Sequence, residues 1–282
     1  MTHRFFAILT VLGIMLSFAA LAEEKQIVIS APNAIVISGE TGEILYEHNA
    51  DEHIYPASTT KILTVFLGAL IGDSNSSVTI SQKAVRMPDD AMRIGFEAGE
   101  VLPLKNLLLA TLVQSGNDGA NAIAESVSGS IPAFVDLMNQ YVVSIGCTDT
   151  HFTNPSGLHD ENHFTSARDM ALITFEAMNN EAFRELSGIG RYNLPPTNLR
   201  EAQILTSHGR AFFENKNSDY YYPGACGIKT GYHSEAGYCF IACAEKNGHT
   251  LIAAVFGCTS YGSCFSNAKS LLDYGFGKIQ NQ

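Results

Sequence analysis

Three short segments of the chain carry side chains that together could perform acyl transfer. The first begins at Ser58 and has Lys61 three residues later, at the start of an apolar segment. On a helix this spacing places both side chains on one face. A serine hydroxyl needs such a neighbouring base to become a nucleophile, and a lysine can be that base only when burial or a nearby cation lowers its pKa. The pair therefore predicts a nucleophile and its base at the start of a buried helix.

The second segment places Ser115 and Asn117 in a polar, glycine-containing loop between two apolar segments. A hydroxyl there can relay a proton, and an amide can orient its neighbours. The third segment, Lys229-Thr230-Gly231, precedes an apolar run. Its lysine can hold a substrate carboxylate, its threonine can donate a hydrogen bond, and its glycine lets a substrate approach the strand edge.

Each segment alone has a plainer interpretation. Serine, glycine and asparagine are common turn residues, and a second Ser-x-x-Lys occurs at Ser266 and Lys269. We interpret that second pair as two polar positions on the exposed side of the last helix. The order and spacing of the three segments together are what predict a site.

The elements that must position these residues follow from hydrophobic periodicity and turn signals. Strands at both ends of the chain and helices grouped in the middle predict an α/β fold of the α+β kind. Its antiparallel sheet is formed by both chain ends and packed with helices, beside a mostly helical lobe. Asn247-Gly248 between two apolar runs is a strong hairpin signal. The expected strands are 27–37, 43–46, 237–243 and 250–257, and the expected helices are 56–71, 103–114, 121–127, 166–177 and 264–274.

At this point the sequence resembles the penicillin-binding and serine β-lactamase superfamily, whose motifs are S-x-x-K, S-x-N and K-T-G. More narrowly it resembles the low-molecular-mass penicillin-binding proteins of the serine D-alanyl-D-alanine carboxypeptidase family. The resemblance also rests on residues 150–158 and 236–238, and it extends over nearly all of the chain after the first segment.

The resemblance implies that Ser58 attacks the carbonyl of the penultimate D-alanine and that water then cleaves the acyl-enzyme. Peptidoglycan stem peptides would be the substrates and β-lactam antibiotics covalent inhibitors, with no metal or cofactor. The implied catalytic residues are Ser58, Lys61 and Ser115, supported by Asn117 and Lys229; the implied substrate-binding residues are Lys229, Thr230, Gly231 and Tyr232. The backbone N–H groups of Ser58 and Tyr232 would form the oxyanion hole.

Three other activities remain open from the sequence: an endopeptidase acting on cross-links, a β-lactamase, and a β-lactam receptor that stays acylated. The β-lactamase needs a base for deacylation, and we find no Glu-x-x-Leu-Asn loop of the class A type. His233 stands where the family usually has threonine, so the outer edge of the pocket is expected to differ. Arg210 and His208 lie in the region where some relatives place a carboxylate-binding arginine.

The first residues indicate export. Arg4 precedes an apolar run, and Ala20-Leu21-Ala22 has the small-x-small pattern of a signal peptidase site. We expect residues 1–22 to be a signal peptide cleaved after Ala22, and residues 23–282 to be one catalytic domain without a C-terminal β-domain. Membrane association is expected only if the first segment is retained. The net charge of −11 argues against nucleic acid as a partner.

Two further patterns have less specific interpretations. Six cysteines in an exported chain permit disulfides, and we expect free or only partly paired thiols. His159 and His163 lie four residues apart, as in zinc peptidases, but no glutamate follows His159 directly. We therefore expect this segment to be a surface loop.

Overall fold

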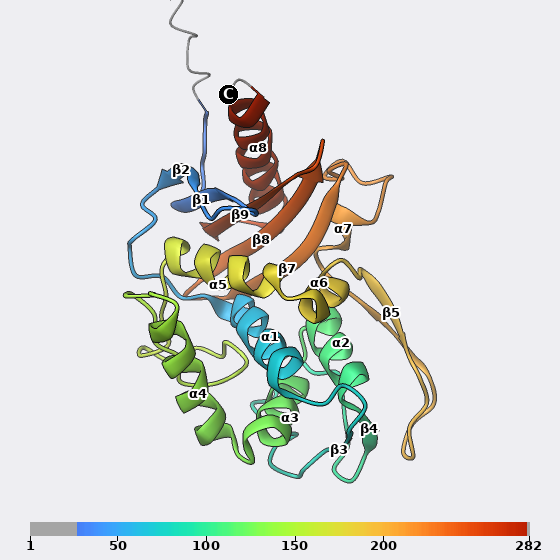
Figure 1. The fold of residues 1–282 in the computed structure, drawn as a ribbon. Coiled ribbons are helices and arrows are strands. Elements are labelled where there is room, and N and C mark those ends of the chain that lie inside the picture. The colour runs from blue at the N-terminus through green and yellow to red at the C-terminus, as the bar shows by residue number, and fades with distance from the viewer. Residues whose placement is uncertain (1–26, 281–282) are drawn as a thin grey trace, which may run out of the picture.

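The computed structural model describes residues 27–280, which form a five-stranded antiparallel sheet beside a helical lobe (Figure 1). The strands lie in the order β2-β1-β9-β8-β7, so both ends of the described chain contribute to one sheet, as predicted. The strands are β1 (Asn33–Ser38), β2 (Ile44–His48), β7 (Ala225–His233), β8 (Gly237–Lys246) and β9 (His249–Cys258). The helices are α1 (Lys61–Ile71), α2 (Leu104–Gln114), α3 (Asn117–Ser128), α4 (Ile131–Ser144), α5 (Ala167–Asn179), α6 (Glu181–Ser187), α7 (Arg210–Phe213) and α8 (Tyr261–Gln280).

The middle parts of β8 and β9 are apolar and buried because both faces of the sheet are covered. Successive side chains of a strand point to opposite faces. In β8, Ile241 belongs to the core on the α1 and α5 side, whereas Phe240 and Ala242 belong to the core under α8. Figure 1 shows α8 on one side of the sheet and α5 on the other. The sheet is therefore the middle layer of the molecule.

Three hairpins, β1–β2, β7–β8 and β8–β9, help to set the register of this sheet. Asn247 and Gly248 have φ of 55° and 82°, which a two-residue hairpin turn requires, so the predicted β8–β9 hairpin is confirmed. The first strand is shorter than predicted and begins at Asn33, after Pro32. The backbone N–H groups of Ser30 and Ala31 bond instead to the Asn267 side chain of α8.

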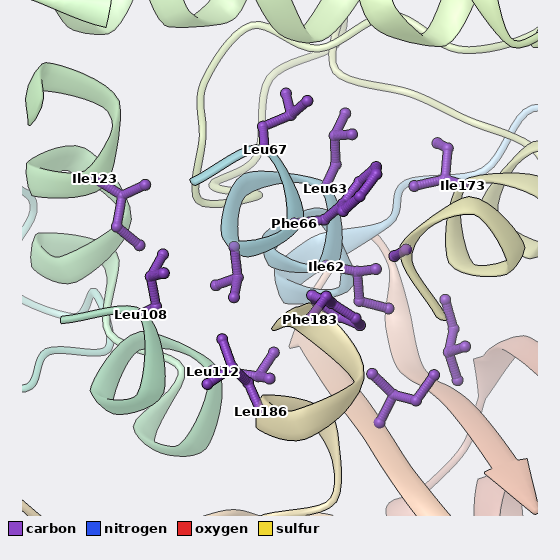
Figure 2. Packing of buried hydrophobic residues seen from close by; sticks show 14 of the residues in the cluster. Ile62, Leu63, Phe66, Leu67, Leu108, Leu112, Ile123, Ile173, Phe183 and Leu186 are labelled. Atoms are coloured by element: carbon purple, nitrogen blue, oxygen red, sulfur yellow. The ribbon is translucent and has the colours of Figure 1, made fainter. Parts of the chain in front are cut away.

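Helix α1 lies at the centre of the helical lobe. Its first eight residues are buried, including Lys61. Figure 2 shows its apolar side chains surrounded by those of α2, α3, α5 and α6; the labelled residues are Ile62, Leu63, Phe66, Leu67, Leu108, Leu112, Ile123, Ile173, Phe183 and Leu186. A helix that is apolar nearly all round is stable only in such a position. The prediction of a buried helix behind Ser58 is confirmed.

Several elements were missed or misplaced by the sequence analysis. Helix α4 was not predicted, although Ser130 caps it by accepting a hydrogen bond from the backbone N–H of Ala133. Helix α3 begins at Asn117, four residues earlier than expected. The prediction missed its first turn because that turn contains a glycine and polar residues. The small pairs β3 (Ser77–Thr79) with β4 (Val101–Pro103) and β5 (Arg191–Leu194) with β6 (Gln203–Thr206) were also missed.

The six cysteines all lie within residues 27–280. Cys226 and Cys243 form a disulfide between β7 and β8, and the other four are free buried thiols. This agrees with the expected partial pairing. The expected signal peptide, residues 1–22, lies outside the described residues. Within the described part, no helix has the length and apolar character needed to cross a bilayer.

Candidate active site

Ser58 lies in a strained turn that precedes α1. A 3₁₀ turn, Ala57–Thr60, leads into the helix, and Ala57 has a φ of +47°, a conformation that costs about 1–2 kcal/mol for a residue with a Cβ. Two buried hydroxyls fasten this turn: Thr59 Oγ1 donates to the carbonyl of Pro56 at 2.7 Å, and Thr60 Oγ1 donates to that of Ala57 at 2.9 Å. The turn presents Ser58, half-buried, to a cleft.

Lys61 is the fully buried neighbour of Ser58. Its Nζ donates to Ser58 Oγ at 3.0 Å, to Asn117 Oδ1 at 2.6 Å and to the carbonyl oxygen of Ser156 at 2.6 Å. Burial, followed by the positive charge of Lys229, holds the pKa of Lys61 well below its ordinary value of 10.5. Both physical conditions for a lysine base are therefore met at this position.

The loop between α2 and α3 brings Ser115 and Asn117 to the same cleft. Ser115 ends α2 in the left-handed conformation with φ of +64°, and Asn117 begins α3. Asp118, buried at 1% exposure, anchors the loop, since its carboxylate accepts hydrogen bonds from the backbone N–H groups of Ile94 and Gly95. The sequence analysis gave Asp118 no role; its position beside Asn117 in a polar loop was the available signal.

Lys229 reaches the cleft from β7, on the opposite side. Its Nζ donates to Ser115 Oγ at 2.9 Å and to the carbonyl oxygen of Thr230 at 2.9 Å. Burial lowers the pKa of Lys229 to about 7. The structure thus brings the three predicted segments together. Ser58 and Lys61 form one hydrogen-bonded pair, and Ser115 and Lys229 form a second. Asn117 accepts a hydrogen bond from Lys61 of the first pair.

Gly231 allows β7 to pass close to the turn that carries Ser58. A Cβ at this position would lie 3.0 Å from the carbonyl oxygen of Pro56 and 3.1 Å from the backbone nitrogen of Ser58. The next residue, Tyr232, is 51% exposed at the cleft edge. The cleft measures about 420 Å³ and is lined by Ser58, Asp90, Ala91, Met92, Ser115, Asn117, Gly157, Leu158, His159, His208, Thr230, Gly231, Tyr232, His233, Tyr238 and Tyr261.

The wall behind Lys61 is a loop within residues 150–158, which the sequence analysis used only for the family resemblance. The side-chain oxygen of Asn154 accepts hydrogen bonds from the backbone N–H groups of Ser156, Gly157 and Leu158. Thr64 of α1 donates to the carbonyl oxygen of Pro155 at 2.6 Å. These contacts fix the Ser156 carbonyl against Lys61. A backbone acceptor of this kind has no side-chain signature, so sequence could not identify it.

The expectation of a surface loop at the two histidines is wrong for His163, which is 2% exposed. Its Nδ1 accepts from the backbone N–H of Thr153, so Nε2 carries the proton and donates to Thr60 Oγ1 at 2.9 Å. Burial lowers the pKa of His163 to about 3, which keeps the ring neutral. His163 therefore stabilises the turn of Ser58 through its hydrogen bond to Thr60. His159 is exposed and lines the cleft.

The two candidates for a carboxylate-binding residue lie in different surroundings. His208 lines the cleft and stacks on Tyr261, with ring centroids 5.8 Å apart. Arg210 is not among the residues that line the cleft, and its Nε pairs with Glu214 at 3.1 Å. The structure thus places His208, not Arg210, at the site.

Gly157→Ala should destabilise the protein by more than about 3 kcal/mol, beyond the cost of left-handed backbone alone. Gly157 has φ of +80°, and a Cβ there would lie 1.8 Å from the carbonyl oxygen of Ala57. Urea unfolding measures the change. The matched control is Gly129→Ala, where φ is +76° but nothing lies within 4 Å; it should cost about 1–2 kcal/mol. Equal losses in the two variants would contradict the close contact.

Lys229→Met should change how stability depends on pH. Because the Lys229 pKa falls from 10.5 to about 7 on folding, the unfolded chain binds more protons between these values, and wild-type stability rises with pH there. The difference in unfolding free energy between wild type and Lys229→Met should therefore shift in favour of wild type by about 2 kcal/mol from pH 7 to pH 9.

Urea unfolding at both pH values measures this shift. The control is Lys105→Met, because the Lys105 side chain is 55% exposed. If the difference for Lys229→Met changed with pH no more than that for Lys105→Met, Lys229 would be charged in the folded protein.

Comparison with known proteins agrees with this geometry. The family model described as D-alanyl-D-alanine carboxypeptidase matches residues 20–260. The Bacillus subtilis protein named D-alanyl-D-alanine carboxypeptidase DacF is 33% identical over 95% of this chain and 70% of its own length.

Two solved structures show the same fold. The D-alanyl-D-alanine carboxypeptidase of Mycobacterium tuberculosis H37Rv has a TM-score of 0.81 and 28% identity, covering 91% of this chain and 95% of that one. Penicillin-binding protein D2 of Listeria monocytogenes, in its ampicillin-bound form, has a TM-score of 0.75 and 26% identity, covering 89% of this chain and 99% of that one. The chain belongs to the D-alanyl-D-alanine carboxypeptidase family and is a serine-type carboxypeptidase of that family.

Proposed function

We propose that this carboxypeptidase removes the terminal D-alanine from peptidoglycan pentapeptides through an acyl-enzyme on Ser58. The observation that supports this most directly is the 3.0 Å hydrogen bond between Lys61 Nζ and Ser58 Oγ, with Lys61 fully buried. Neutral Lys61 accepts the proton of Ser58 Oγ as this oxygen attacks the carbonyl carbon of the penultimate D-alanine. The negative charge that develops on the carbonyl oxygen is received by the backbone N–H groups of Ser58 and Tyr232.

The second hydrogen-bonded pair serves the leaving group. Ser115 Oγ lies 2.9 Å from Lys229 Nζ and shares the cleft with Ser58. Ser115 donates a proton to the departing amine of D-alanine and is resupplied through Lys229 or Lys61. The acyl–Ser58 ester then reacts with water, which regenerates the hydroxyl and releases the shortened peptide.

The substrate carboxylate also helps to set the protonation states. Lys229 has a pKa of about 7, so the free enzyme holds it partly neutral. A carboxylate bound beside Lys229 and Thr230 favours the charged form of Lys229. That charge in turn favours neutral Lys61, the form that can act as a base. Binding of the correct substrate end thus prepares the base.

The proposal extends to the location of the enzyme and to its inhibition by β-lactams. Residues 1–22 would direct export and be removed after Ala22, leaving residues 23–282 as the catalytic domain in the cell-wall space. β-Lactams would acylate Ser58 and stay attached for long, because deacylation of such adducts needs a well-placed base. Among the described residues that line the cleft, Asp90 supplies the only carboxylate, and it is exposed.

The experiment is D-alanine release from a pentapeptide ending in D-Ala-D-Ala, with a peptide ending in D-Ala-L-Ala as matched control and a cross-linked muropeptide dimer as second substrate. We expect D-alanine from the first peptide and little product from the other two. Cleavage of the dimer in preference to the pentapeptide would make the enzyme an endopeptidase. No release from any of them, with normal acylation by a penicillin, would make it a receptor.

A further inference from the structure

The rim of the cleft gathers three metal-ligating side chains that the acyl-transfer chemistry does not use. His159, His233 and Glu235 each offer one ligand atom, and these atoms all lie within 4.8 Å of one another. His233 Nδ1 is 3.1 Å from Glu235 Oε2, and the rings of His159 and His233 have centroids 5.2 Å apart. The two histidines converge although they are 74 positions apart in the sequence.

The chemistry of this set is that of a zinc site. Two imidazoles and one carboxylate suit Zn²⁺, which takes three protein ligands and keeps a fourth position open in sites that face a pocket. Ligands at about 2 Å from a tetrahedral ion stand about 3.3 Å apart, so closing the set requires a movement of at most about 1.5 Å. His159 and Glu235 are exposed to solvent, which leaves room for a movement of this size.

The ring of Tyr55 contacts both histidines, with centroids 4.8 Å from His159 and 6.1 Å from His233. Tyr55 therefore limits the orientations that the two rings can adopt.

We infer that His159, His233 and Glu235 bind one Zn²⁺ ion at the mouth of the active-site cleft. The ion would tie together two walls of the cleft. His159 belongs to the loop that supplies the Ser156 carbonyl to Lys61, and His233 ends β7, the strand of Lys229. The site is separate from the acyl-transfer step, for which the ion supplies no chemistry.

The test is calorimetric titration of the metal-stripped full enzyme with ZnCl₂ alone at pH 7.5. We expect one equivalent to bind to wild type. His159→Gln and His233→Gln should each weaken binding by about 100-fold or more, since loss of a ligand costs at least as much as loss of a group that orients one. Glu235→Gln should weaken binding less, because an amide oxygen remains a ligand without the charge.

The matched control is His53→Gln, because His53 is an exposed histidine that also lies 3.3 Å from a carboxylate, that of Asp149. This variant should bind zinc as wild type does. Far-ultraviolet circular dichroism and the melting temperature without zinc verify that each variant folds. Zinc should raise the melting temperature of wild type and His53→Gln but not that of the His159 and His233 variants. Absence of binding to wild type, or equal binding to the His159, His233 and His53 variants, would overturn the inference.

Discussion

Ser58→Ala should reduce D-alanine release by at least about 10⁴-fold, because it removes the hydroxyl that forms the ester intermediate. The Ser58 hydroxyl is the one held 3.0 Å from Lys61, and it faces the cleft. The substitution removes one half-buried oxygen, so the fold and the melting temperature should change little. The measurement is steady-state release of D-alanine from the pentapeptide, with circular dichroism of the variant.

The chain provides a matched control in its second Ser-x-x-Lys pair. Ser266 is exposed on α8, and Lys269 lies on the same helix, away from the residues that line the cleft. Ser266→Ala should keep wild-type activity. If Ser58→Ala stayed active while Ser266→Ala lost activity, the assignment of the nucleophile would be wrong.

Lys61→Arg should reduce the rate of acylation by about 10³-fold, although arginine is also a long, basic side chain. Arginine stays protonated in proteins and cannot accept the proton of Ser58. Burial and the charge of Lys229 lower the Lys61 pKa, so wild-type acylation should fall as the pH is lowered and Lys61 becomes protonated. The measurement is the second-order rate constant of acylation by a penicillin as a function of pH.

Two further variants separate the loss of the base from other effects. Lys61→Met should lose as much activity as Lys61→Arg, although it removes the amino group together with its three hydrogen bonds. Lys269→Arg, in the second Ser-x-x-Lys pair, should be indistinguishable from wild type. Near-normal acylation by Lys61→Arg would mean that Lys61 acts through its charge and that another group is the base.

The parts of the fold that sequence predicted are those with a strong periodic or turn signal. The β8–β9 hairpin was recognisable from Asn247-Gly248 between two apolar runs, and the capped start of α5 from Ser166, which accepts a hydrogen bond from the backbone N–H of Asp169. Helix α4 was missed although it has a regular apolar stripe, in which Phe134, Met138 and Val142 are buried and Leu137 and Tyr141 pack beside them. This spacing of three and four residues is a helical period, so the pattern could have predicted the helix.

Some residues of the site could likewise be predicted from the sequence, and others could not. The groups that would perform chemistry have reactive side chains at informative spacing, so Ser58, Lys61 and Lys229 could be predicted as candidates from the sequence. The groups that position them act through backbone or by accepting backbone hydrogen bonds, as Asp118 and Asn154 do. Asparagine and aspartate in loops are common for other reasons, so their roles became visible only in three dimensions.

The most direct test of the acyl-enzyme mechanism is intact-mass spectrometry of the enzyme during incubation with a penicillin, followed by peptide mapping. The mechanism predicts one persistent adduct per molecule, located on the peptide that contains Ser58, and no adduct on the Ser58→Ala variant. No adduct, or an adduct on another residue, would contradict the mechanism. A transient adduct with consumption of the drug would instead identify the enzyme as a β-lactamase.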